Sequence, residues 1–81
     1  MQQVTDPSQI SAGMVLLAED SDRFLFEAAR RNGRVLQGRI LATDDPNKRL
    51  CNRLINLRTD MRKYYLLTEG ELILYRFQLG A

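Results

Sequence analysis

The sequence predicts a small, mainly β single domain over residues 1–81, with about five strands and at most one helix, at 46–61. Three observations favour this fold class. Asn32-Gly33 lies between two apolar-rich runs, which is the strongest short-range signal for a β-hairpin. Glu69-Gly70 lies between two further apolar runs, and 81 residues leave room for one core. The alternative is an α+β domain in which two hairpins pack on one helix.

The first third of the chain contains a lead-in and one strand. Residues 1–12 are polar and include Pro7, so we expect a loosely ordered lead-in. Residues 14–18 form an apolar run of strand length. The acidic residues 19–22 that follow are typical of a polar loop.

A hairpin over 24–42 is the central element of the predicted fold. Asn32 and Gly33 both tolerate the positive φ that a type I′ turn requires, and such a turn would fix the register. One face would then contain the pairs Leu25–Ile40, Glu27–Gly38 and Ala29–Leu36. The other face would contain the pairs Phe26–Arg39 and Arg30–Val35.

Residues 44–63 fit two structures. Asp45 as N-cap and Pro46 at the first helical position favour a helix. Its apolar stripe would consist of Leu50, Leu54, Leu57 and Met61. A strand is the alternative, with one face made of Cys51, Arg53, Ile55 and Leu57.

The last element is predicted to be a second hairpin, with strands at 64–68 and 71–77 and a turn at Glu69-Gly70. Aromatic and β-branched residues on both strands would stabilise it through cross-strand pairs. The pairs would be Leu67–Leu72 and Tyr65–Leu74 on one face, and Leu66–Ile73 and Tyr64–Tyr75 on the other.

The charge is unevenly distributed, although the net charge is only +2. Residues 1–29 have five acidic side chains and one basic, a net −4. Residues 30–63 have ten basic side chains and three acidic, a net +7, and residues 64–81 have a net −1. A basic middle segment of this kind indicates a polyanionic partner, or else a solvated face.

The composition also argues against several classes of protein. The chain has no histidine and one cysteine, Cys51, so a zinc site, a cofactor and nucleophilic catalysis are not expected, and we do not expect an enzyme. No apolar run approaches the roughly 20 residues that span a bilayer, and no secretory signal is visible. A single cysteine favours a reducing compartment, so we expect a cytoplasmic protein without a membrane partner.

Two short stretches resemble known families. The run 14–18 followed by Glu19-Asp20-Ser21-Asp22 resembles the opening of a response-regulator receiver domain, whose acidic residues hold Mg²⁺ before a helix. That resemblance implies a helix over 22–31 capped by Ser21. It covers about 20 residues, and the rest of the chain departs from the family. The stretch 10–15 with the following hairpin resembles the start of the KOW- and SH3-like barrels of translation and transcription factors, which implies a small SH3-like barrel.

The basic segment is the main functional indication. We expect a non-enzymatic nucleic-acid-binding or regulatory module that binds single-stranded RNA or DNA. Arginine binds phosphate bidentately and stacks on bases, and aromatic rings provide stacking platforms. The candidate phosphate-binding residues are Arg30, Arg31, Arg34, Arg39, Arg49 and Arg53, and the candidate stacking residues are Phe26 and Tyr64.

A second hypothesis uses the aromatic end of the chain. Tyr64, Tyr65, Tyr75 and Phe77 give both faces of the predicted terminal hairpin apolar character. Tyrosine is enriched in interface hot spots, and a terminal hairpin leaves an open edge. The alternative function is therefore a protein-interaction adaptor or inhibitor that forms a homodimer or binds another protein.

Overall fold

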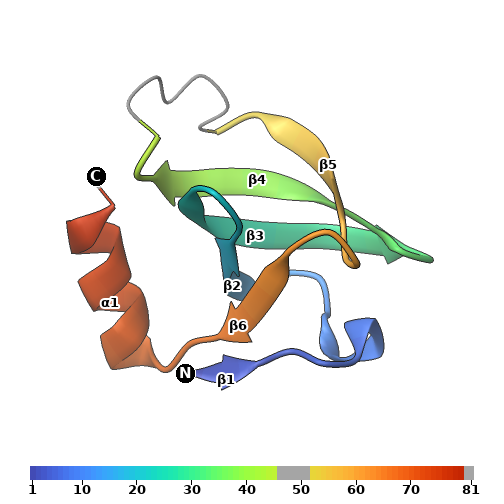
Figure 1. Ribbon diagram of the computed structural model, residues 1–81, viewed down its shortest axis with the longest axis horizontal. Helices are drawn as coiled ribbons and strands as arrows, with labels where there is room; N and C mark the ends of the chain where they lie inside the picture. Colours follow the sequence, from blue (N-terminus) through green and yellow to red (C-terminus); the bar gives the residue numbers. More distant parts are fainter. Residues whose placement is uncertain (46–51, 80–81) are drawn as a thin grey trace.

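In the computed structural model, described for residues 1–45 and 52–79, six strands form one antiparallel sheet and a single helix follows (Figure 1). The elements are β1 (Gln2–Gln3), a 3-10 turn (Pro7–Gln9), β2 (Val15–Glu19), β3 (Arg23–Asn32), β4 (Val35–Thr43), β5 (Leu54–Arg58), β6 (Lys63–Leu66) and α1 (Glu69–Gln78). The strand order is β1-β6-β2-β3-β4-β5, so β1 and β5 are edges and the curled sheet does not close. The prediction of a mainly β fold is confirmed.

Each side of the sheet has its own apolar cluster. The inner cluster contains Leu16, Phe24, Phe26, Leu36 and Tyr64, among others, and the strands curl around it. The outer cluster is smaller and consists of Leu17, Leu25, Ala42 and Leu79, with Leu72 and Tyr75 of α1 packed against it. Alternate residues of β2 and β3 therefore enter different clusters, as the period of a strand requires. The helix covers only part of the outer side.

The long β3–β4 pair is bent by two irregularities and a glycine. The register shifts between Leu25 and Phe26, and again between Ala28 and Arg30, which are bulge positions. Between them Gly38 pairs with Ala28, and a Cβ at Gly38 would collide with the carbonyl oxygen of Glu27 and lie 2.7 Å from Cζ of Phe26. Bulges and a strand glycine are the usual means of curving a sheet.

The turn of this hairpin lies one residue later than predicted. Gly33 and Arg34 form the two-residue turn, and Asn32 pairs with Val35 at the end of the ladder. Gly33 has φ of +60° while Arg34 does not have positive φ, a pattern typical of type II′ and not of type I′. The predicted register was therefore wrong. The observed pairs include Phe26–Ile40, Glu27–Arg39, Ala28–Gly38, Arg30–Gln37 and Arg31–Leu36.

The predicted terminal hairpin was also wrong, because residues 69–78 are helical. Thr68 caps this helix, and its side chain accepts a hydrogen bond from Glu71 N while the Glu71 side chain accepts one from Thr68 N. This capping box outweighs the β-branched and aromatic content of the segment. The spacing of Leu72, Tyr75 and Leu79 then places them on one helical face against the sheet.

At two places where a helix was considered the structure has a strand, and in the first of them the strand alternative is confirmed for residues 54–58. Within 46–61, residues 54–58 form β5, with Ile55 and Leu57 toward the inner cluster; residues 46–51 lie outside the described part of the chain. The helix implied over 22–31 by the resemblance to receiver domains is replaced by β3. Within the lead-in, β1 pairs with β6, and Ile10 is buried in the inner cluster.

The contact at Gly38 generates a prediction about stability. We expect Gly38→Ala to lower the free energy of unfolding by about 2–3 kcal/mol, because the added methyl group has no space beside the Phe26 ring and the Glu27 backbone. Urea denaturation followed by circular dichroism measures the change. Gly70→Ala is the matched control, since a Cβ there meets no atom within 4 Å. Equal stability of Gly38→Ala and the wild type would contradict the assigned packing.

Candidate nucleic-acid interface

The outer side of β3, β4 and β5 beyond α1 presents mainly polar side chains in three cross-strand rows. Paired residues of an antiparallel sheet share a face, and that face alternates along each strand. The rows are Glu27–Arg39–Leu54, Arg30–Gln37–Asn56 and Asn32–Val35–Arg58. We call these nine residues the outer β3–β4–β5 face. All are exposed apart from half-buried Gln37, and they lie toward the hairpin end opposite α1 (Figure 1).

A hollow lies in the middle of this face. Its volume is about 290 Å³, and it is lined by Arg30, Asn32, Val35, Gln37 and Asn56. Two asparagines and a glutamine supply both donors and acceptors, and Arg30 supplies a donor-only guanidinium group. The hollow can therefore hydrogen-bond a ligand that has both anionic oxygens and mixed donor and acceptor edges.

The arginines of this region differ in how far carboxylates already neutralise them. Arg58 donates from Nε and Nη2 to Asp60 at 3.0 and 2.9 Å, and Arg34 lies 3.8 Å from the same carboxylate. These contacts hold the pKa of Asp60 below its ordinary value, first through the hydrogen bond from Arg58. Arg30 and Arg39 form no ion pair with any carboxylate of the described residues. They are the cations of the face most available to an external anion.

The structure brings together only part of the predicted phosphate-binding set. Arg30 and Arg39 share the outer β3–β4–β5 face, and Arg34 occupies the hairpin turn. Arg31 pairs with inward-facing Leu36, so it is on the other side of the sheet, where its Nη1 donates to the carbonyl oxygen of Gly33 at 3.0 Å. Arg53 is exposed just before β5. Arg49 lies outside the described residues.

The two predicted stacking residues are corrected. Phe26 has no exposed surface and Tyr64 is 3% exposed, so neither ring has a face available to a base. Phe26 was expected opposite Arg39, but the observed register places Glu27 there and turns Phe26 into the core. Both rings instead hold the inner cluster together.

The sequence interpretation missed the amide side chains of the hollow. Gln37 and Asn56 carry no charge, so the count of basic residues gave no reason to select them. Their alignment with Arg30 depends on the true hairpin register and on residues 54–58 being a strand. The alternation of Ile55 and Leu57 was the available signal, because it places Asn56 on the opposite face.

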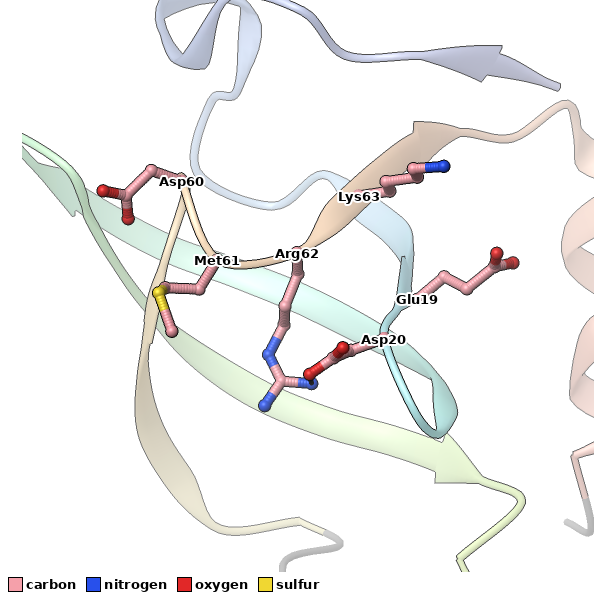
Figure 2. Close-up of a pocket in the computed structure, with 6 residues that line it drawn as sticks. All are labelled: Glu19, Asp20, Asp60, Met61, Arg62 and Lys63. Atoms are coloured by element: carbon pink, nitrogen blue, oxygen red, sulfur yellow. Dashed lines mark ion pairs between the residues drawn. The ribbon is translucent and has the colours of Figure 1, made fainter.

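A larger hollow near the β5–β6 turn has a different character. Figure 2 shows Arg62 extending alongside Asp20, with Asp60 and Lys63 directed away from it. The hollow has a volume of about 420 Å³ and is lined by Glu19, Asp20, Asp60, Met61, Arg62 and Lys63. Arg62 Nη1 lies 3.9 Å from Asp20 Oδ2, and Asp60 is bound by Arg58. The charges that line this hollow are thus largely compensated within the protein.

Arg62 also covers the side of the inner cluster that the unclosed sheet leaves open. Its guanidinium carbon lies 5.2 Å from the centroid of the Phe24 ring, a distance typical of a cation–π contact. Beside it is a hollow of about 130 Å³ whose apolar floor includes Phe24, Ile40, Ile55 and Leu57. We assign Arg62 a structural role at this opening.

Two general findings apply to residues 1–45 and 52–79. Nowhere in these ranges do three or more potential metal-binding side chains gather. No helix there has the length and apolar character needed to cross a membrane.

Comparisons with models of known families, with curated proteins and with solved structures found no match to this chain.

Tyr64 generates a prediction about pH. Its hydroxyl donates to the carbonyl oxygen of Arg58 at 2.9 Å, and burial raises the pKa of Tyr64 to about 12. The unfolded chain loses this proton first, near pH 10, so the stability contributed by the protonated phenol is complete below pH ~10 and is lost as the pH rises toward 12. The free energy of unfolding should therefore fall more steeply over this interval in the wild type than in Tyr64→Phe. Urea denaturation at several pH values measures both slopes.

The same variant has an expected effect at neutral pH. Tyr64→Phe removes one buried hydrogen bond, so its free energy of unfolding at pH 7 should be lower by about 1 kcal/mol. The other two tyrosines and the two lysines remain in both proteins, so their effects cancel in the comparison. Parallel pH profiles for the two proteins would show that Tyr64 does not retain its proton in the folded state as described.

Proposed function

We propose that this protein is a non-enzymatic nucleic-acid-binding module that holds single-stranded RNA or DNA on the outer β3–β4–β5 face. The observation that carries the proposal is the position of Arg30 and Arg39, free of carboxylate partners among the described residues, beside a hollow lined by amides. A guanidinium group binds phosphate oxygens bidentately. The adjacent amides match the donors and acceptors of base edges and of the ribose hydroxyl.

On this face the geometry supports separate roles for the arginines and for the amide side chains. Arg30 and Arg39 are on neighbouring strands and bind successive phosphates of an extended strand. Gln37 on β4 and Asn56 on β5, in one row with Arg30, hydrogen-bond the bases or sugars that enter the hollow. With Phe26 and Tyr64 buried, any stacking on this face comes from guanidinium planes and not from those rings.

The position of these groups on paired strands favours a defined contact. Side chains on a sheet are held at fixed spacings by the backbone ladder, whereas loop residues are more mobile. Glu27, opposite Arg39, limits nonspecific attraction at that end of the face. The proposal is therefore a shaped polar contact that includes a strong salt-dependent component.

Fluorescence anisotropy tests the proposal with labelled, random-sequence single-stranded RNA and DNA at about 50 and 200 mM salt. The wild type should bind, and binding should weaken as salt rises because releasing counterions into a more concentrated salt solution gains less free energy. The double variant Arg30→Gln, Arg39→Gln should bind more weakly, and its slope of log affinity against log salt should be shallower by about 1.4, from two lost phosphate contacts.

Lys63→Gln is the control, because it removes the same type of charge from an exposed position on β6, away from the face. It should leave binding nearly unchanged, and none of the variants should shift the thermal midpoint. Absence of binding at micromolar chain and low salt would reject the proposal. A loss of binding free energy in the control half as large as in the double variant, for one charge removed against two, would show that only net charge matters.

Protein interaction remains a second candidate function, and one observation favours it. The predicted aromatic terminal hairpin does not exist, but α1, which replaces it, exposes Ile73 and Phe77 by 71% and 85%. Large apolar side chains that share one helical face and are exposed to solvent are typical of binding surfaces.

A further inference from the structure

One side of α1 is exposed to solvent in the described part of the chain. Gly70, Ile73, Leu74 and Phe77 recur at intervals of three and four, so they form one stripe along the helix. This stripe is opposite the one formed by Leu72, Tyr75 and Leu79, which packs on the sheet. We call the four exposed residues the α1 outer stripe.

We propose that the α1 outer stripe binds the same stripe of a second copy of this chain, with the two helices antiparallel. A two-fold axis between Ile73 and Leu74 sets Ile73 against Leu74 of the second copy. The same axis sets Phe77 against Gly70 of the second copy, at both ends of the contact. The surface is thus self-complementary, which a two-fold interface requires.

The sizes of the opposed residues favour this pairing. Phe77 is the most exposed large apolar side chain on the described surface, at 85%. No atom lies within 4 Å of the position that a Cβ would take on Gly70, so the backbone there is open to close approach. The largest side chain of the stripe therefore meets the smallest, and a ring placed over Gly70 would lose most of its contact with water.

The charges beside the stripe select the antiparallel orientation. Glu69 and Arg76 are seven residues apart, close to two helical turns, so they flank the stripe on the same side. In an antiparallel pair each Glu69 lies beside Arg76 of the second copy. A parallel two-fold pair would place the Glu69 and Arg76 side chains of the two copies on opposite sides of the contact, so this attraction would be absent.

The charges of α1 argue against a lipid surface as the occupant, and the position of α1 leaves the outer β3–β4–β5 face accessible. The exposed charges of α1, Glu69 and Arg76, balance, and half-buried Glu71 lies 2.9 Å from the amino group of Met1, so α1 has no cationic excess to bind an anionic lipid surface. In Figure 1, α1 and the tip of the β3–β4 hairpin are at opposite ends of the domain. Pairing through α1 would therefore leave both outer β3–β4–β5 faces accessible. This inference does not depend on the proposed nucleic-acid function.

Sedimentation equilibrium of the full chain over a concentration series tests dimer formation. One short helix pair is a small interface, so we expect a weak dimer, populated as the chain approaches about 1 mM. Phe77→Lys should raise the dimer dissociation constant at least tenfold while the circular dichroism spectrum stays unchanged, because Phe77 makes little contact within the domain. Met61→Lys is the matched control, since Met61 is 67% exposed on the β5–β6 turn, and it should not alter the dissociation constant.

Cross-linking tests the orientation in a Cys51→Ser background. Leu74→Cys places the thiol groups beside the two-fold axis, so a short bis-maleimide should join two copies efficiently. Glu69→Cys places them at opposite ends of an antiparallel pair, so it should cross-link poorly. A monomer at every concentration, an unchanged dimer with Phe77→Lys, or efficient cross-linking through Glu69→Cys would each overturn the proposal.

Discussion

The Phe26 ring packed across Gly38 is the contact on which the rest of the structure depends. A side chain at Gly38 would meet the Glu27 carbonyl and the Phe26 ring, so only glycine allows β3 and β4 this close approach. The two register shifts lie on either side of the contact and bend the same pair of strands. Because the sheet curls there, strands from β2 to β6 can surround one apolar cluster in a chain of 81 residues.

The curl also divides the outer side of the sheet into two regions. Leu17, Leu25 and Ala42 form an apolar region that α1 covers, and the rows from Arg39 to Arg58 form a polar region that remains exposed. Both regions use the outward positions of the same strands. The switch in residue type along β3 and β4, from leucine and alanine to arginine and amides, therefore sets where the helix ends its coverage and where a ligand could bind.

The sequence predicted the fold class and the central hairpin, but not the details that orient side chains. Alternation and Asn32-Gly33 located β3 and β4, yet a one-residue shift of the turn and a bulge near Ala29 moved Phe26 into the core. Such shifts depend on packing at Gly38, which no local pattern reveals. For α1, the Thr68–Glu71 capping box was present in the sequence, but β-branched and aromatic residues suggested a strand. Arg30 and Arg39 could be selected from charge alone, whereas Gln37 and Asn56 required the register.

Both faces of β6 are apolar because each packs within the domain. The surface available to a protein partner is therefore on α1 and not on β6. Tyr64 enters the inner cluster and Tyr65 packs with the outer one, which α1 covers. A helix with ten residues can bury one stripe against the sheet, and its other stripe then faces solvent. If that stripe joins two copies, each dimer carries two outer β3–β4–β5 faces. A nucleic-acid strand long enough to span both faces would bind with higher avidity than one face provides. Because one stripe of α1 covers the sheet, the opposite stripe is left exposed, and this is the surface through which two copies would pair and bind one nucleic-acid strand.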